Sequence, residues 1–197
     1  MEDVEHLLFQ LHWNTPNDDL ELAKIKLKEL QDHELLVLVQ PMLDKSLWDN
    51  AADLLAEIGY PRIRPILYEL LSWLQDMNWP GSIIISKLLV SVGEPLIPYI
   101  KRALKEGDSI WNYWILIYIV GLWDRGLIEM LSQELYELSS GFDHEGAHIE
   151  SLRLLSREHI LDETTLFHLI FLQKANEKNQ ENIEDLIEIE KMINSKG

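Results

Sequence analysis

Apolar residues recur at spacings of three and four along nearly the whole chain, and no segment shows the sustained alternation of a β-strand. This pattern predicts an all-α protein with about eleven or twelve helices. Helices outside the middle of the chain are expected at roughly 2–13, 16–31, 33–43, 124–138, 143–157, 163–175 and 183–194. Thr15-Pro16, Asp143 and Asp162 are typical residues at helix starts, because their side chains or fixed backbone suit the first turn.

The middle of the chain contains an internal repeat. The segment LLAEIGYPRIRPILYELL (54–71) aligns with LLVSVGEPLIPYIKRAL (88–104) at an offset of 33 to 34 residues. We expect Gly59 and Gly93 to end the first helix of each repeat, and the prolines that follow keep that helix from continuing. A period of this length holding two helices is typical of α-solenoids, so the sequence predicts an α–α superhelix of helical pairs.

The predicted superhelix forms one domain over residues 1–197, with four parts. These are N-terminal helices (1–45), the clearest repeats (46–125), divergent repeats (126–176) and a C-terminal helix (177–197). The last segment has an apolar stripe at 183–194, and a terminal helix with a polar outer face would close the core. The alternative is a loosely held helix that binds a partner.

Two parts of this region resemble known families. Residues 54–71 resemble a HEAT-type repeat, including the small bacterial kind. The longer block 59–116 is similar to an uncharacterised bacterial family of unknown function with HEAT-like helices, and the string W-L-x-D-x-N-W-P, from Trp73 to Pro80, is its specific part. The resemblance covers about 40–125, implies an α–α superhelix and supplies no activity.

Composition limits the functions that are open to the chain. Its 47% hydrophobic content and seven tryptophans suffice for a sizeable core, and its net charge of −17 disfavours nucleic-acid binding and suits a basic partner. The lack of cysteine excludes disulfides and thiol catalysis and fits a cytoplasmic location. The N-terminus does not read as a signal peptide, and the apolar stretch 110–123 is too short to cross a membrane, so no membrane association is expected.

The stretch SWLQDMNWPGS (72–82) has two interpretations. As a turn between helices, Asp76 or Asn78 would cap the next helix while Trp73 and Trp79 fill the space between helices. As a binding site, the same rings beside polar groups resemble an interaction hot spot. A column of Trp48, Trp79 and Trp111 at equivalent positions of the repeats is expected to be core, and any exposed ring in it becomes a binding candidate.

Basic residues recur at equivalent places in the two repeats. Arg62 and Arg64 flank Pro61 and Pro65, and Lys101-Arg102 lies at the related position. Salt bridges to Glu57, Glu69 and Glu94 are the simpler interpretation. The alternative is a contact with an anion or a carboxylate of a partner.

The segment HEGAH (144–148) matches the H-E-x-x-H pattern, in which His144 and His148 would bind zinc with Glu145 as general base. No third ligand follows at a usual spacing, and Gly146 and Asp143 indicate that the motif lies across a helix start. No phosphate-binding loop or Ser–His–Asp pattern is present, and no cofactor is expected.

The sequence therefore predicts a non-catalytic protein–protein interaction module whose solenoid surface binds a basic partner. A narrower alternative is an immunity protein that neutralises a bacterial toxin, and a further one is a zinc-dependent hydrolase acting through HEGAH. The sequence leaves the oligomeric state and the binding face open.

Overall fold

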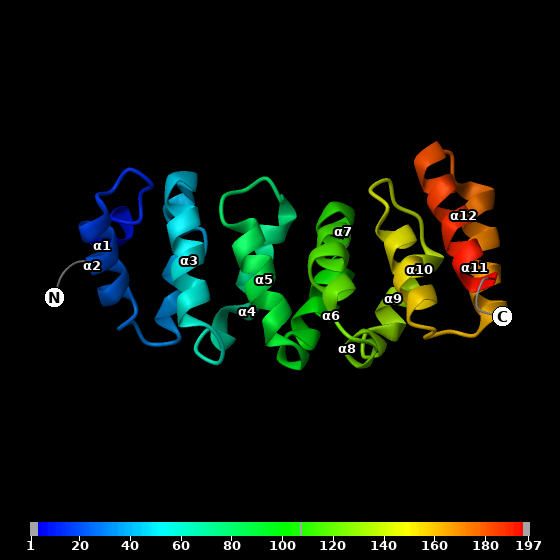
Figure 1. Cartoon of the computed structure of the whole chain (residues 1–197), viewed down its shortest axis with the longest axis horizontal. Coiled ribbons are helices and arrows are strands. Elements are labelled where there is room, and N and C mark those ends of the chain that lie inside the picture. The colour runs from blue at the N-terminus through cyan, green and yellow to red at the C-terminus, as the bar shows by residue number, and fades with distance from the viewer. Residues whose placement is uncertain (1–3, 107, 195–197) are drawn as a thin grey trace. The chain divides into compact units, whose positions relative to one another are not determined.

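The computed structural model describes residues 4–106 and 108–194. Over those residues the elements are α-helices α1 to α12 and short 3-10 helices η1 to η7, with no strand, so the all-α prediction is confirmed. The chain forms two compact units, Met1–Val92 and Gly93–Gly197, which are described separately below (Figure 1). The expectation of a single solenoid domain stays a prediction.

Unit 1 is built around α3, which packs against α5 (Figure 1). Leu54 and Leu55 of α3 and Leu89 of α5 are fully buried, as the three-and-four spacing predicts. The elements of this unit are α1 Val4–Phe9, α2 Asn17–Leu27, η1 Glu34–Leu38, η2 Pro41–Leu43, η3 Lys45–Leu47, α3 Trp48–Ile58, η4 Arg64–Ile66, α4 Leu67–Leu70, η5 Leu71–Gln75 and α5 Ser82–Val92.

The repeat boundaries agree with the sequence prediction, but the helix between them differs. α3 ends directly before Gly59 and α5 directly before Gly93, and both glycines have a positive φ. The second half of the first repeat, residues 64–75, is one turn of α-helix between two 3-10 helices. The predicted helix at 33–43 is likewise replaced by 3-10 turns, whose tighter hydrogen bonding suits short segments.

Unit 2 is organised around α10, which packs against α7, α9, α11 and α12. Its elements are η6 Glu94–Leu96, α6 Ile97–Lys105, α7 Ser109–Tyr118, η7 Val120–Leu122, α8 Arg125–Glu129, α9 Ser132–Ser140, α10 Ala147–Arg157, α11 Glu163–Asn176 and α12 Gln180–Asn194. The segment 124–138, predicted as one helix, is divided between α8 and α9. In α12, Leu186, Ile189 and Ile193 of the predicted stripe are buried.

Within the described residues, no single helix is long and apolar enough to cross a bilayer. Among those same residues, only Ser82–Val92 and Glu94–Lys105 taken together reach that length and composition.

Candidate functional site

The stretch 72–82 forms a loop held by its tryptophans. Trp73 is fully buried and its Nε1 donates a hydrogen bond to the Pro80 carbonyl oxygen at 2.8 Å. Trp48 packs edge-on against Trp73 and Trp79, with ring centroids 6.1 and 5.4 Å apart. The rings therefore join this loop to the first turn of α3. Their packing explains why a tryptophan occupies position 73 without requiring contact with a binding partner.

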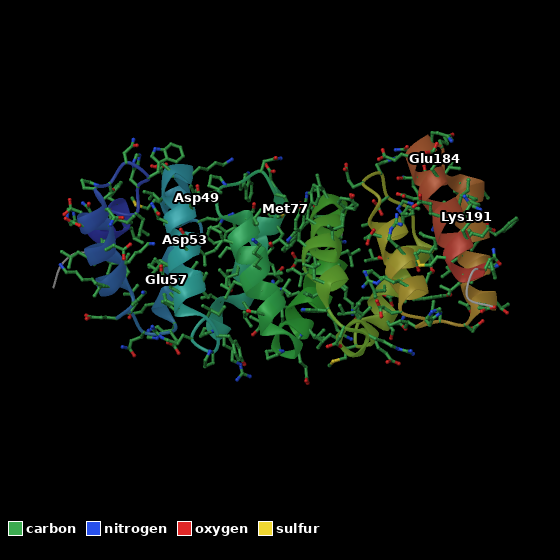
Figure 2. The ribbon with its side chains drawn as sticks, viewed as in Figure 1. Asp49, Asp53, Glu57, Met77, Glu184 and Lys191 are labelled. Carbon is green, nitrogen blue, oxygen red and sulfur yellow. The ribbon has the colours of Figure 1, made fainter. Side chains whose placement is uncertain are left out.

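Asp76 and Asn78 pair with each other instead of capping α5. Oδ1 of Asp76 accepts hydrogen bonds from the backbone N–H of Asn78 at 2.9 Å and from its side-chain Nδ2 at 3.0 Å. This Asx-type turn replaces the predicted cap, because a short side chain readily accepts from the N–H two residues further on. Figure 2 labels Met77, the residue between them, in the loop before α5.

The expected hot spot is only partly at the surface. Trp73 has no exposed area and Trp111 is 5% exposed, so neither ring can contact a partner in this conformation. Asn78 is exposed, and Asp76 and Trp79 are half-buried. Lys45 Nζ lies 5.2 Å from the centroid of the Trp79 ring, which gives that ring a cation–π neighbour.

Arg62 ties together two distant segments of unit 1. Its Nε lies 2.9 Å from Asp32 Oδ1, its Nη1 donates to the Lys28 carbonyl oxygen at 2.8 Å, and its Nη2 donates to the Leu30 carbonyl oxygen. The predicted salt bridges to Glu57, Glu69 or Glu94 are therefore wrong for Arg62. The guanidinium instead secures the end of α2 and the chain that follows it, a task that suits its fixed array of donors.

Replacing Arg62 with alanine is expected to lower the free energy of unfolding by about 2 kcal/mol, because two backbone carbonyls and Asp32 lose a charged donor. Arg64→Ala is the matched control, since Arg64 is exposed and forms no ion pair with the described residues. Its expected effect is below about 0.5 kcal/mol. Urea unfolding monitored by circular dichroism measures both. Equal losses would show that Arg62 does not tie the two segments together.

The HEGAH segment does not form a zinc-binding helix. α10 begins at Ala147, so His144 lies in the preceding loop and the two histidines are not one turn apart on a helix. The predicted helix start across this motif is thereby confirmed. Among the described residues, no group of three or more His, Asp or Glu is placed to hold a metal ion.

Asp143 organises the loop between α9 and α10. Its Oδ1 accepts hydrogen bonds from the backbone N–H groups of Glu145, Gly146 and Ala147, and its Oδ2 accepts one from that of His148. Oδ2 also lies 2.9 Å from His148 Nδ1. Burial alone would raise the pKa of Asp143, but the hydrogen bonds from His148 and the backbone outweigh it and lower the pKa to about 2.

His148 lies between two carboxylates. The residue is fully buried, and its Nε2 is 3.6 Å from Glu177 Oε2 in the segment joining α11 and α12. That distance is an ion-pair contact for a protonated ring and too long for a hydrogen bond. His148 thus connects the α9–α10 loop to the α11–α12 segment, which explains structurally why histidine occupies this position.

A hollow of about 220 Å³ lies beside this loop, bounded by α7, α10, α12 and the two loops. We call it the acidic hollow. Its charged groups are four carboxylates and one guanidinium. Its lining residues are Tyr113, His144, Glu145, Gly146, Ile149, Glu150, Arg153, Asn179, Glu181, Asn182 and Asp185.

Arg153 neutralises only part of this charge. Its Nε lies 3.1 Å from Glu150 Oε2 and its Nη2 lies 2.9 Å from Asp185 Oδ1. Burial raises the pKa of Glu150, with a smaller contribution from Asp185 in the same direction. Burial also raises the pKa of the Tyr113 hydroxyl, and Glu150, Asp185 and Glu181 add to the rise. The hollow therefore has an excess of negative charge beside an aromatic ring.

A second acidic surface lies on α3 in unit 1. Asp49, Asp53 and Glu57 follow one another along the helix at intervals of four residues (Figure 2). Lys28 Nζ lies 2.5 Å from Glu57 Oε2, and Lys24 Nζ lies 3.5 Å from its Oε1. These lysines compensate one end of the row, so it is a less concentrated negative surface than the acidic hollow.

Sequence reasoning missed the acidic hollow. Its carboxylates come from the α9–α10 loop, α10 and α12, which no single linear motif joins. The HEGAH segment, which contains Glu145, was the available signal, and it was interpreted as a possible zinc site. Trp114 and Tyr118, the other half-buried rings of α7, lie beside Tyr113 along the same helix.

The fold and this geometry define an all-α protein whose second unit carries a strongly acidic hollow. Comparison with known families places residues 42–160 in the domain of unknown function DUF5071, and the chain belongs to this family. The prediction of a family of unknown function is thereby confirmed, while the string from Trp73 to Pro80 stays a prediction as its specific part. No curated protein matches the chain, and no solved structure does.

Proposed function

We propose that the protein is a non-catalytic binding module that recognises a basic surface of a partner protein through the acidic hollow. The observation that carries this proposal is the set of four carboxylates facing one guanidinium beside Tyr113. The net charge of −17 would also accelerate the encounter with a positively charged partner by long-range attraction.

The chemistry of the hollow suits a lysine or arginine side chain. Carboxylates form short, charge-assisted hydrogen bonds with ammonium and guanidinium groups. The ring of Tyr113 offers an aromatic face that attracts a cation when water is excluded. Arg153 keeps Glu150 and Asp185 in place, so the carboxylates are held in position before the partner arrives.

The proposed fold subclass, location and biological role rest on the sequence alone. We take the chain to be a HEAT-like solenoid that acts in the cytoplasm, and an immunity protein against a basic toxin would be one case of such a binder. The described geometry lends no support to a zinc-dependent hydrolase, because His144 and His148 do not share a helical face with a third ligand.

A charge-neutralising variant of α12 tests the proposed function. Glu181→Gln/Asp185→Asn is expected to weaken binding of a fluorescein-labelled arginine-rich peptide about tenfold, since it removes two carboxylates of the hollow and leaves Arg153 less compensated. Fluorescence anisotropy at fixed salt measures the affinity. Circular dichroism confirms that the variant is folded.

Glu184→Gln/Glu188→Gln is the matched control for net charge. Both residues are exposed on the same helix and do not line the hollow, and Figure 2 labels Glu184 near the start of α12. We expect less than about a twofold change from this variant, because exposed charges contribute weakly at physiological salt. Equal losses in the two variants would show that the peptide senses overall charge and would overturn the proposal.

A further inference from the structure

A second cavity in unit 2 has a different character from the acidic hollow. It has a volume of about 380 Å³ and lies between the end of α6, the start of α7, α9 and the α9–α10 loop. We call it the α9 pocket. Its lining combines apolar side chains with buried polar ones: Leu104, Lys105, Ser109, Asn112, Glu134, Glu137, Leu138, Gly141, Phe142, Asp143 and Ala147.

Asn112 lines this pocket and has an acceptor oxygen without a donor. The residue is 2% exposed, and its Nδ2 donates to the Leu104 carbonyl oxygen at 3.3 Å. That bond fixes the amide orientation, because the reverse orientation would bring two oxygens together. Oδ1 is buried and has no hydrogen-bond partner in the described structure. A buried acceptor without a donor costs free energy that a ligand's N–H can recover.

Glu134 supplies a second acceptor. The residue is 5% exposed, and its carboxylate is approached by two lysines, with Lys101 Nζ 3.2 Å from Oε2 and Lys105 Nζ 3.4 Å from Oε1. Lys101 forms an ion pair with the buried Oε2, so Oε1 is the acceptor that becomes available when Lys105 moves. The Lys105 side chain is 61% exposed, and it can therefore leave Glu134 for solvent at little cost.

The remaining polar groups that line the pocket make it acidic. Both oxygens of Asp143 are occupied by the loop and by His148. Glu137 is exposed and accepts a hydrogen bond from Gln133. Three carboxylates line the pocket and two ammonium groups face them, Lys105 in the lining and Lys101 against Glu134, so the net charge is negative and a cation is favoured over an anion.

We propose that the α9 pocket binds a guanidinium group carried on a short aliphatic chain. Asn112 Oδ1 and Glu134 Oε1, the oxygen that Lys105 contacts, accept hydrogen bonds from the guanidinium, whose several N–H donors can serve two acceptors at once. Leu104, Leu138 and Phe142 contact the aliphatic stem. Lys105 withdraws from Glu134 as the ligand enters, and the ligand's charge replaces it.

An arginine side chain of the basic partner is the source of the guanidinium that fits this chemistry. The inference rests on the proposed function only in this identification of the source. The pocket itself is tested with a small probe that carries no other recognition element. N-acetyl-arginine-N-methylamide is that probe, and the citrulline derivative, in which a neutral urea replaces the guanidinium, is its matched control. Agmatine tests whether a free guanidine binds as well as an arginine side chain.

Titration of the isotopically labelled full chain, followed by NMR of the Asn112 side-chain amide, measures the affinity. We expect millimolar binding of the arginine derivative and at least about tenfold weaker binding of the citrulline derivative. Glu134→Gln should weaken the arginine derivative about tenfold, and Lys105→Met should strengthen it severalfold by removing the competing cation. Glu129→Gln, an exposed single-charge loss on α8, should change nothing.

Two results would overturn the inference. One is equal binding of the arginine and citrulline derivatives, and the other is binding that Glu134→Gln and Lys105→Met leave unchanged. If agmatine binds more tightly than the arginine derivative, the occupant of the pocket is a free guanidine compound and not an arginine side chain of the partner. Failure here is separate from failure of the proposed function, because the labelled peptide's response to Glu181→Gln/Asp185→Asn reports on the acidic hollow alone.

Discussion

Gly81→Ala is expected to lower the free energy of unfolding by about 3 kcal/mol. A Cβ atom at this position would lie 2.6 Å from the Ala52 Cβ and 3.0 Å from the Trp48 carbonyl oxygen. Both contacts are with α3 near its backbone, which cannot rotate out of the way as a flexible side chain does. The φ of +82° adds strain for any residue with a Cβ, so overpacking and backbone strain act together.

Urea unfolding of the full chain, followed by circular dichroism, measures this loss, and Gly146→Ala provides the comparison. Gly146 has a similar φ of +89°, but a Cβ there would come no closer than 3.8 Å to any neighbour. Its expected cost is about 1 kcal/mol, from backbone strain alone. If both substitutions cost the same, the close approach of the 72–82 loop to α3 does not control stability.

Local sequence signals predicted most of the helices. Asp162 caps α11 as expected, with its Oδ1 accepting from the Thr165 N–H at 2.9 Å. The repeated Leu54-Leu55 and Leu88-Leu89 pairs are buried, as the spacing of three and four requires. Such signals act within one or two turns of a helix, so a single sequence contains them in full.

Interactions between distant segments were not predictable in the same way. Arg62 pairs with Asp32, 30 residues earlier, although nearer glutamates offered the same charge. The choice of partner depends on where the chain after α2 passes, which no local sequence pattern predicts.

Asp76 illustrates a different difficulty. Its type and position suited a helix cap, but the turn at Asn78 satisfied the same carboxylate locally.

The acidic hollow was missed for a related reason. Its carboxylates are ordinary surface residues of amphipathic helices when the sequence is read one segment at a time. Glu145 and Asp185 are brought to one hollow only because α10 packs against both α7 and α12. The HEGAH segment marked the right region, but its histidines have other roles, since His148 bridges Asp143 and Glu177.

Asp143→Ala is expected to lower the free energy of unfolding at pH 7 by about 3 kcal/mol. The substitution leaves four backbone N–H groups of the α9–α10 loop and the buried His148 ring without their acceptor. Asp76→Ala is the matched control, because the Asp76 carboxylate accepts hydrogen bonds from Asn78 alone in a partly exposed turn. Its expected cost is below about 1 kcal/mol.

The contribution of Asp143 to the free energy of unfolding also depends on pH, and its lowered pKa determines the direction of that dependence. The folded-state pKa of about 2 lies below the ordinary aspartate pKa of 3.8, so the ionised carboxylate stabilises the fold fully above pH 3.8. This contribution, at most about 2 kcal/mol because solvent partly screens the group, is lost as the pH falls toward 2. Asp143→Asn cannot ionise, so its deficit relative to the natural chain should shrink as urea unfolding is repeated from pH 6 downward. A deficit that stays constant over that range would show that the hydrogen bonds around Asp143 do not depend on its charge.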